Sequence, residues 1–235
     1  MRVVVGERMG GPEVLAVAER EAPRPGPGEV VVEVAAAGVN YMDIYQREGV
    51  GNYRTDPPFV PGAEGAGTVV AVGSDVKDLS VGDHVAWAGQ GSSYAEQVAL
   101  AANRVVPVPD GMNLQVAAAA ILQGMTAHYL CTSTYPVREG DITVVHAAAG
   151  GVGLLLTQLV KRRGGLVVGT TSGGEKVELA LQAGADHVVG YDRFRDIVDE
   201  ASDGAGAHVV YDGVGKDTFD DGLAALRPRG MMVLY

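Results

Sequence analysis

The alternation of apolar and polar positions gives the first half of the chain the character of a β-rich domain. Short Val-rich runs follow one another, separated by Pro-Gly and Gly-Asp turns, and this pattern is typical of an antiparallel barrel or sandwich. The runs are "RVVVGE", "GPGEVVVEVAAAGV", "GAGTVVAVGS", "VGDHVAWAG", "YAEQVAL" and "RVVPVPDGM".

The pattern changes from Leu114 onward, where apolar residues recur at helical spacing and later runs alternate between strand and helix. This alternation predicts right-handed β-α-β units around a parallel sheet. The predicted strands cover 142–146, 166–170, 187–189, 208–212 and 231–235, and the predicted helices cover 154–163, 175–183, 194–201 and 218–226. We therefore expect an α/β protein with a β-rich domain over 1–118 and a dinucleotide-binding domain over 119–235. Because the pattern stops on the strand "GMMVLY", we expect this sheet to be incomplete on its C-terminal side.

Composition restricts the class of protein. The chain has 235 residues, is 47% hydrophobic and has no apolar run long enough for a membrane span, so we expect a soluble, cytoplasmic protein. Its net charge of -11 argues against nonspecific binding to nucleic acid. The single cysteine, Cys131, excludes an internal disulfide and a multi-cysteine metal site. Without an activating base nearby in the sequence, it is predicted to be a buried, inert thiol.

A glycine-rich turn joins the first predicted strand of the second half to the helix that follows it. In "VVHAAAGGVGLLLTQ", Ala148, Gly150 and Gly153 occupy the three positions of the G-x-G-x-x-G pattern, with alanine in the first place. In dinucleotide-binding folds this turn brings the backbone and a helix N-terminus against a pyrophosphate. We therefore expect 150–153 (Gly150, Gly151, Val152 and Gly153) to bind a dinucleotide, with Gly150 and Gly153 at the closest approach to phosphate.

The next predicted strand end favours NADPH over NADH. An NAD site needs an acid about 20 residues after the turn to bind the ribose 2′-hydroxyl, and 154–174 contains no Asp or Glu. Instead, "GTTSGGEK" offers Ser172, the backbone N–H groups of Gly173 and Gly174, and Lys176, which suit a 2′-phosphate. Tyr191 either contributes a hydroxyl or a stacking face to this site or packs in the core.

Several ordered motifs resemble those of a known family. They are "AAGVNYMDIYQREG", "PFVPGAEGAGTVVAVG", "LQGMTAHYL", "HAAAGGVGLLLTQ", "GTTSGGEK", "AGADHVV" and "VVYDGVG". Together they resemble the zinc-free, zeta-crystallin-like NADPH:quinone oxidoreductases of the medium-chain dehydrogenase/reductase superfamily. The resemblance implies a GroES-like catalytic domain followed by a Rossmann domain, with NADPH in the cleft between them. It also implies a homodimer where the C-terminal part is complete.

The residues at the zinc positions of this superfamily argue against a metal. The zinc-binding relatives use a cysteine and a Gly-His-Glu stretch, and catalytic zinc needs three protein ligands. The corresponding places here hold Asn40 and the stretch Gly62-Ala63-Glu64. We expect Glu64 to be a packing or turn carboxylate. The five histidines are far apart in the sequence, so we expect core or surface roles for them.

The resemblance also implies the catalytic and cofactor residues. It places Asn40 at the nicotinamide, Tyr45 along the cleft and Tyr53 within reach of a substrate carbonyl, while Asp43 either orients its neighbours or handles a proton. For either tyrosine, plain packing is the alternative. The remaining residues that it places at the cofactor are Thr126, Tyr129, Val214 and Tyr235.

Chemistry without a metal favours substrates that are already electrophilic, and quinones meet this condition because their reduction yields an aromatic hydroquinone. The leading hypothesis is therefore NADPH-dependent reduction of small soluble quinones, by hydride or electron transfer from nicotinamide. One alternative is a zinc-free reductase of enones or enoyl thioesters. The other is a non-catalytic NADPH-binding protein with a crystallin-like or RNA-binding role, although the acidic balance weakens the RNA version.

Overall fold

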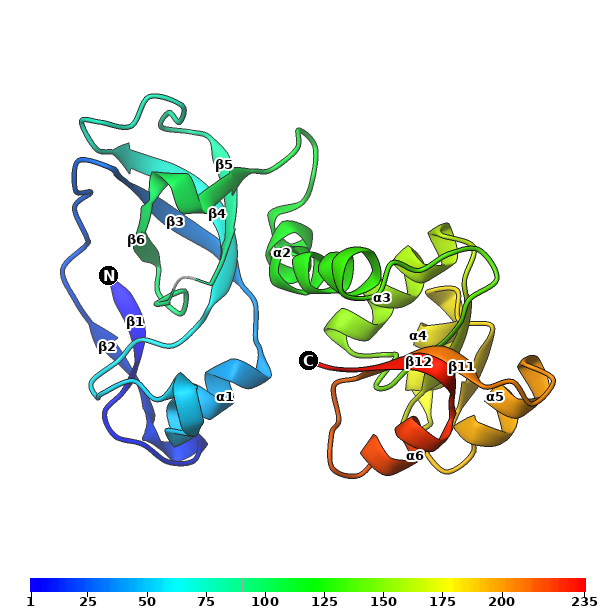
Figure 1. The fold of residues 1–235 in the computed structure, drawn as a ribbon. Helices are drawn as coiled ribbons and strands as arrows, with labels where there is room; N and C mark the ends of the chain where they lie inside the picture. The colour runs from blue at the N-terminus through cyan, green and yellow to red at the C-terminus, as the bar shows by residue number, and fades with distance from the viewer. Residues whose placement is uncertain (90) are drawn as a thin grey trace. The chain divides into compact units, whose positions relative to one another are not determined.

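The computed structural model describes residues 1–89 and 91–235 and divides into two compact units, Met1–Leu122 and Gln123–Tyr235 (Figure 1). The helix α2 (Leu114–Tyr129) contributes residues to both units. The domain boundary predicted between residues 118 and 119 falls inside this helix. That boundary stays a prediction.

The first unit is built on antiparallel strands, as the sequence pattern predicts. Five strands pair in the order β6-β3-β4-β5-β7, and a separate hairpin joins β1 to β2. The strands are β1 (Arg2–Gly6), β2 (Leu15–Glu19), β3 (Glu29–Ala37), β4 (Glu64–Val72), β5 (His84–Ala88), β6 (Gln97–Ala101) and β7 (Val105–Pro107). The unit also contains α1 (Tyr41–Glu48) and the short helices Pro12–Val14, Gly51–Tyr53 and Ala102–Arg104.

The core of the first unit forms on one face of the five-stranded sheet. Val30, Val32, Val69 and Trp87 are buried there, on alternate positions of three neighbouring strands. The indole N–H of Trp87 donates a hydrogen bond of 2.9 Å to the Ser93 hydroxyl, so the buried ring keeps its polar group satisfied. This packing gives a rigid base for the loop and helix that follow β3.

The second unit is a parallel sheet with the strand order β10-β9-β8-β11-β12. The first strand lies at the centre and the chain winds outward on both sides, which is the order of dinucleotide-binding folds. Its strands are β8 (Ile142–Val145), β9 (Leu166–Thr170), β10 (His187–Val189), β11 (Ala207–Asp212) and β12 (Leu226–Leu234). Its helices are α3 (Gly151–Arg162), α4 (Glu175–Gln182), α5 (Phe194–Ala201) and α6 (Phe219–Ala224), and Leu130–Thr134 forms a π-helix after α2.

Several boundaries in this unit differ from the predicted ones, and those at the start of α3 and around β12 differ most. Helix α3 begins at Gly151 and not at 154, because the glycines that weaken the helical pattern already belong to its first turn. Helix α6 ends at Ala224 and strand β12 begins at Leu226. The predicted helix over 218–226 was therefore too long, and the predicted strand over 231–235 began too late. The pairing of β11 with β12 shifts register between Ala207 and Val209, and this irregularity lets the segment before the methionines join the sheet. Pro228 is compatible with this strand because β12 is at the edge.

Both faces of the parallel sheet are covered. On one face, α2, α3 and α4 contribute apolar side chains such as Leu156 and Val160, and on the other α5 contributes Phe194 and Val198. All four of these side chains are buried, as expected for a parallel sheet between two helical layers. Cys131 is fully buried in the first of these layers, which confirms the predicted buried thiol.

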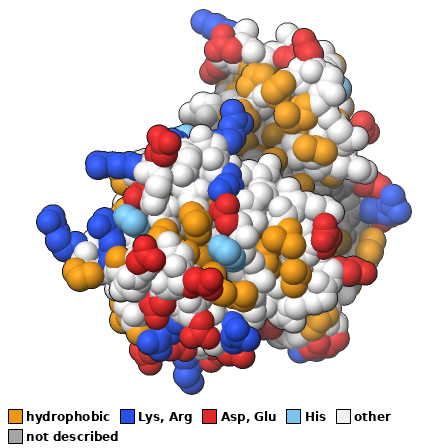
Figure 2. Space-filling model, turned by 90° about the vertical axis from the view of Figure 1, so that its right-hand side faces the viewer, with side chains coloured by type: hydrophobic (Ala, Val, Ile, Leu, Met, Phe, Trp, Pro, Cys, Tyr) orange, Lys and Arg blue, Asp and Glu red, His pale blue; other side chains and the backbone are white. Residues whose placement is uncertain are grey.

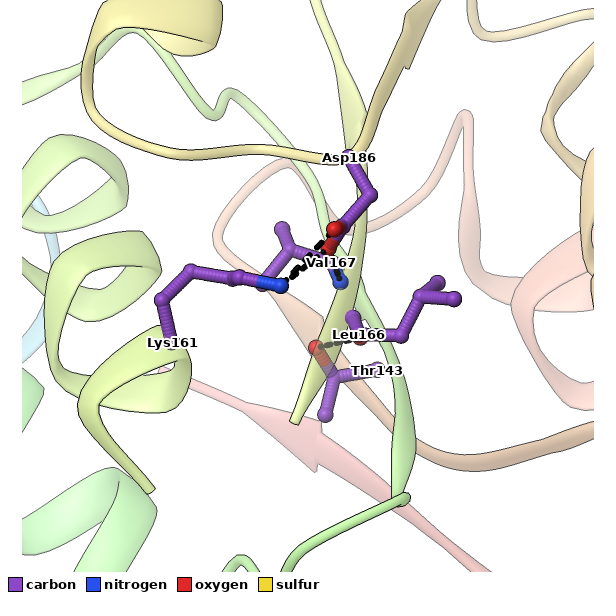
Figure 3. A network of polar contacts seen from close by, with 5 residues as sticks. All are labelled: Thr143, Lys161, Leu166, Val167 and Asp186. Carbon is purple, nitrogen blue, oxygen red and sulfur yellow. Dashed lines mark hydrogen bonds and ion pairs between the residues drawn. The ribbon is translucent and has the colours of Figure 1, made fainter. Parts of the chain in front are cut away.

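Asp186, Lys161 and Val167 form a network of polar contacts at the amino end of β9, called here the Asp186 clamp (Figure 3). The carboxylate of Asp186 accepts hydrogen bonds from Lys161 Nζ at 2.7 and 2.8 Å and from the backbone N–H of Val167 at 2.7 Å. Next to it, the Thr143 hydroxyl donates to the Leu166 carbonyl at 2.9 Å. The clamp therefore connects the last turn of α3 with β9 and the segment before β10.

The acidic residues behind the net charge of -11 are dispersed over the surface and are not gathered in one patch on the face shown in Figure 2. Figure 2 shows acidic side chains scattered over the visible face, with basic side chains among them. Over the residues that the structure describes, no helix combines the length and apolar character that a bilayer crossing requires.

Candidate functional site

The glycine-rich turn lies between β8 and α3, where the sequence places it. Ala147 adopts a positive φ of 51°, and Gly150 caps the helix and donates its N–H to the Ala147 carbonyl at 2.8 Å. Helix α3 then begins at Gly151, so Val152 and Gly153 lie in its first turn. The N–H groups of a first turn have no partners within their helix, and together with the helix dipole they suit an anion such as pyrophosphate.

Two small residues of this turn have packing roles that sequence reasoning missed. A Cβ on Gly153 would lie against the Ala147 carbonyl oxygen and 2.8 Å from the Ala148 carbonyl carbon, so Gly153 allows the helix to pack on the turn itself. Its close approach to phosphate stays a prediction. Ala148, which replaces the first glycine, is fully buried beside Gly169 of β9, where a Cβ would lie 2.8 Å from that of Ala148. Gly169 therefore makes room for this alanine.

The loop after β9 brings together the residues predicted to hold a 2′-phosphate. Lys176 Nζ donates to the Ser172 hydroxyl at 3.1 Å. Gly173 and Gly174 have φ values of 89° and 65°, a conformation that favours glycine, and open space surrounds both Cα atoms. The Gly173 N–H donates to the Thr171 hydroxyl at 3.2 Å. The Lys176 ammonium, the Ser172 hydroxyl and the backbone of two glycines thus lie close together, in the loop after β9 and the first turn of α4.

A cavity of about 490 Å³ opens beside this loop. Its apolar walls include Val177, Val188 and the ring of Tyr191, whereas Ser172 gives it a polar rim. Apolar walls suit a flat aromatic base such as adenine, and the adjoining Lys176 suits a phosphate. The lining also includes an acid, Asp192, whose side chain is exposed. The residues present therefore fit the adenosine phosphate end of NADPH.

The loop after β11 is organised by an acid that sequence reasoning missed. Asp212, the last residue of β11, is 1% exposed and its carboxylate accepts hydrogen bonds from the N–H groups of Val214 (2.8 Å) and Gly215 (2.9 Å). The Thr218 hydroxyl donates to the same carboxylate at 2.9 Å. The signal in the sequence is an Asp at the end of a buried strand, followed by the glycine-rich "GVG". Asp212 therefore fixes the loop on which Val214 is exposed.

Tyr235 lies against the same loop. Its N–H donates to the Asp212 carbonyl at 3.3 Å, and a Cβ on Gly213 would lie 3.1 Å from its Cζ. Burial raises the pKa of the Tyr235 phenol to about 12, and the charge of Asp212 acts in the same direction. Tyr129 also acts to raise the pKa of Tyr235. Thr126 lies three residues before Tyr129 on α2, and therefore on the same side of the helix.

In the first unit, the residues at the zinc positions form a hydrogen-bonded pair. The Asn40 side-chain amide donates to Glu64 Oε1 at 2.8 Å, and the Leu122 N–H donates to Oε2 at 3.0 Å. Glu64 is fully buried on β4, and each of its carboxylate oxygens accepts a hydrogen bond from within the first unit. Zinc in proteins is bound by Cys, His and Asp or Glu, so the Asn40 amide is not one of its usual ligands, and Ala63 has no ligand atom. This donor set does not fit a tetrahedral zinc site.

Asp43 stabilises the start of α1. Its Oδ2 accepts hydrogen bonds from the Asn40 N–H and from the Tyr94 hydroxyl, both at 2.9 Å. Burial raises the pKa of Tyr94 well above its ordinary value, and the charge of Asp43 acts in the same direction. Asp43 thus holds the backbone of Asn40, and its role in orienting neighbours or handling a proton stays a prediction. Tyr94 was not among the predicted residues because it lies 51 positions away in the sequence.

Tyr45 and Tyr53 form an aromatic pair on the surface of the first unit. Their ring centroids are 5.6 Å apart with planes tilted by 43°, and Tyr41 continues the row at 6.4 Å from Tyr45. The residues Tyr45 and Tyr53 remain 39% and 46% exposed. An exposed row of aromatic faces with hydroxyl groups can stack on and hydrogen-bond to a flat, carbonyl-bearing molecule.

Comparisons with known proteins agree with this arrangement. Residues 26–110 match the family model described as the alcohol dehydrogenase GroES-like domain, and residues 151–235 match the one described as zinc-binding dehydrogenase. A quinone oxidoreductase of Pseudomonas aeruginosa is 43% identical over 232 residues, a match that covers 96% of this chain and 70% of that protein.

Two solved structures extend the comparison. A mycobacterial protein in complex with NADPH superposes with a TM-score of 0.94 at 44% identity and covers 100% of this chain and 74% of its own. The Escherichia coli quinone oxidoreductase in complex with NADPH gives a TM-score of 0.92 at 35% identity, covering 99% of this chain and 72% of its own.

A GroES-like unit followed by a Rossmann unit with a glycine-rich turn defines the class of medium-chain dehydrogenases and reductases. Within that class, the chain belongs to the quinone oxidoreductase family.

Proposed function

We propose that this chain binds NADPH and reduces small soluble quinones. The observation that carries the proposal is the loop after β9, where Ser172 and Lys176 meet beside an apolar cavity, and the segment 154–174 contains no Asp or Glu. Membership in the quinone oxidoreductase family supports the choice of substrate class.

Most of the residues that would hold NADPH belong to the second unit. The amides at the start of α3, from Gly150 to Gly153, would bind the pyrophosphate, and Ser172, Gly173 and Lys176 would bind the 2′-phosphate. Tyr191 would contact the adenosine. In this proposal the nicotinamide half is held by Asn40, Thr126, Tyr129, Val214 and Tyr235. When bound, NADPH supplies the reducing equivalents as a hydride or as electrons from nicotinamide.

The tyrosine pair would hold the quinone. Tyr45 would stack along the ring, and the Tyr53 hydroxyl would donate a hydrogen bond to the quinone oxygen on which negative charge develops. Asp43 would act on this site through Asn40, whose N–H it holds. Because Asn40 and Ala63 cannot polarise a carbonyl through zinc, a substrate that is electrophilic by itself suits these residues.

The wider setting belongs to the same proposal. We place the protein in the cytoplasm with a small-molecule substrate and without a nucleic-acid partner, and we expect it to form a homodimer. We also propose that the catalytic domain covers residues 1–118 and the NADPH-binding domain residues 119–235.

Steady-state oxidation of NADPH tests the proposed function. Turnover is measured with a benzoquinone, a naphthoquinone and a cyclic enone at equal concentrations, with NADH as a parallel cofactor. Faster turnover of the quinones with NADPH is the expected result. Faster turnover of the enone would support an alkene reductase, and NADPH binding without turnover of any acceptor would support a non-catalytic protein.

A further inference from the structure

A buried histidine, to which neither the predicted nor the proposed function gives a role, lies under the cofactor loops. His146 follows the last residue of β8 and directly precedes the glycine-rich turn. His146 is fully buried. Its backbone N–H donates a hydrogen bond of 3.0 Å to the Tyr211 carbonyl, which continues the pairing of β8 with β11. The backbone of His146 is thus fixed at the centre of the sheet, just where the turn begins.

The side chain of His146 connects the turn to the end of β9. Its Nδ1 lies 2.8 Å from the hydroxyl of Thr170, which is also fully buried. The carbonyl of the same threonine accepts a hydrogen bond of 2.9 Å from the Ala148 N–H. Thr170 is therefore held by a side chain on one side of the turn and by the backbone on the other. Thr171 and Ser172, which begin the 2′-phosphate loop, follow it directly.

The imidazole also lies next to two aromatic rings. Its ring centroid lies 5.9 Å from that of Tyr191 and 4.8 Å from that of Phe194, to which it is perpendicular. Tyr191 lines the same cavity as Ser172 and Gly173. The side chain of His146 thus lies next to Tyr191, which lines the cavity, and to Thr170, which directly precedes the lining residues Thr171 and Ser172.

The chemistry of this position favours a functional role over plain packing. Burial holds the pKa of His146 below its ordinary value, against the opposing charge of Asp212, so the ring is neutral at pH 7. Its Nε2 has no hydrogen-bond partner among the residues that the structure describes. A buried nitrogen without a partner costs stability, and an aromatic hydrocarbon ring of the same size would pack without that cost.

We propose that His146 is a positioning residue for the cofactor, which holds Thr170 and Tyr191 in register with the glycine-rich turn and thereby sets the preference for NADPH over NADH. The inference rests on the proposed binding of NADPH. It predicts that the hydrogen bond to Thr170 affects recognition of the 2′-phosphate much more than recognition of the part that NADPH and NADH share.

Matched substitutions at the two positions test this inference. His146→Phe keeps a ring but loses the hydrogen bond, whereas His146→Asn keeps a polar atom near the position of Nδ1. Thr170→Val removes the hydroxyl and keeps the shape, whereas Thr170→Ser keeps the hydroxyl. Calorimetric titration with NADPH and with NADH gives the dissociation constants, and thermal melting of each variant reports whether it folds.

We expect His146→Phe and Thr170→Val to raise the dissociation constant for NADPH about tenfold and that for NADH much less. Each substitution removes the hydrogen bond between the His146 ring and the Thr170 hydroxyl, which positions the start of the 2′-phosphate loop. The conservative variants His146→Asn and Thr170→Ser should retain most of the NADPH affinity. Equal effects on both cofactors, or no effect in folded variants, would overturn the inference. Failure of the unmodified protein to bind NADPH would instead overturn the proposed function.

Discussion

Lys176, in the first turn of α4, lies four residues after Ser172, and its ammonium donates to the Ser172 hydroxyl at 3.1 Å. Both side chains come from the exposed loop and first turn after β9, next to glycines with positive φ. The pair places a positive charge and a hydroxyl where the NAD-binding members of the fold place an acid.

Replacing Lys176 with alanine tests this pair. We expect the dissociation constant for NADPH to rise about tenfold or more, because a charge-assisted contact to phosphate is lost, while that for NADH changes little. Calorimetric titration of both cofactors measures the effect. Lys77→Ala, which removes an exposed lysine of the first unit, is the matched control. A parallel loss of affinity for both cofactors would contradict the phosphate role.

Removal of the Tyr53 hydroxyl tests the proposed quinone site. Tyr53→Phe keeps the ring next to Tyr45, so we expect kcat/KM for a benzoquinone to fall about three- to tenfold with unchanged NADPH affinity. Tyr41→Phe, at the far and more exposed end of the aromatic row, serves as the control and should leave kcat/KM unchanged. Equal losses in the two variants would exclude a specific hydrogen bond from Tyr53.

Gly153→Ala tests the packing of α3 on its own turn. The added methyl group would meet the backbone of Ala147 and Ala148, which cannot rotate away, so we expect a loss of about 1–3 kcal/mol in the free energy of unfolding. Urea denaturation measures it. As a control, Gly124→Ala places a methyl group 3.9 Å from the nearest side-chain atom, within α2, and should stabilise the helix by about 0.5–1 kcal/mol. A neutral Gly153→Ala would mean that the turn can shift freely.

The Asp186 clamp predicts unequal effects from its two partners. Asp186→Ala leaves the Val167 N–H without its acceptor and should cost about 1–3 kcal/mol, whereas Lys161→Ala removes only a partly exposed ion pair and should cost less than about 1 kcal/mol. Asp186→Asn keeps an acceptor for Val167 and should fall between these values. Urea denaturation of the three variants provides the comparison. A larger loss from Lys161→Ala than from Asp186→Ala would show that the charge pair dominates.

Acid should destabilise the second unit through His208. The Nδ1 of this residue accepts a hydrogen bond of 3.0 Å from the Ile142 N–H, so a proton on Nδ1 would break the contact. Burial and the charge of Arg227 lower the pKa of His208, while Asp141, 3.5 Å from its Nε2, acts in the opposite direction. The unfolded chain therefore binds the proton first, and this contribution to stability is lost as the pH falls below about 6.5.

Thermal melting between pH 5 and pH 8 measures this effect, and His208→Asn provides the comparison. The asparagine oxygen can accept from Ile142 without titrating, so Tm of the variant should fall less on acidification than Tm of the unmodified protein. His146, whose pKa is lowered as well, remains in both proteins and contributes equally to both curves. Identical pH dependence of the two would exclude His208 as a source.

The sequence predicted the second unit better than the details of its loops. Val-rich runs and helical spacing identify β8 to β11 within a residue or two, because strands of a parallel sheet are buried on both faces. The start of β12 was missed, since "LRPRG" has neither apolar alternation nor strand-forming residues and joins the sheet only by pairing with β11. In the first unit, "LAVAE" was too short and too weakly patterned to reveal β2.

In the candidate site, too, some residues could be identified from the sequence and others only from the fold. Ser172 and Lys176 could be paired from the sequence because they are only four residues apart and two glycines lie between them. Asp212 and Tyr94 could not, since their roles depend on which backbone N–H or side chain faces them after folding. The role of Gly169 likewise depends on the neighbouring strand, because only the pairing of β8 with β9 brings it against Ala148.

Gly169 and Ala148 together make the glycine-rich fingerprint a property of two strands. The close approach of Gly169 excludes a bulky side chain at position 148. The absence of a side chain at Gly169 leaves room for the methyl group of Ala148. The two positions are therefore expected to change in concert: a return to glycine at 148 frees 169 to acquire a side chain. Motif searches that score the turn alone will undervalue such chains, and a search that reads both positions jointly would recover them.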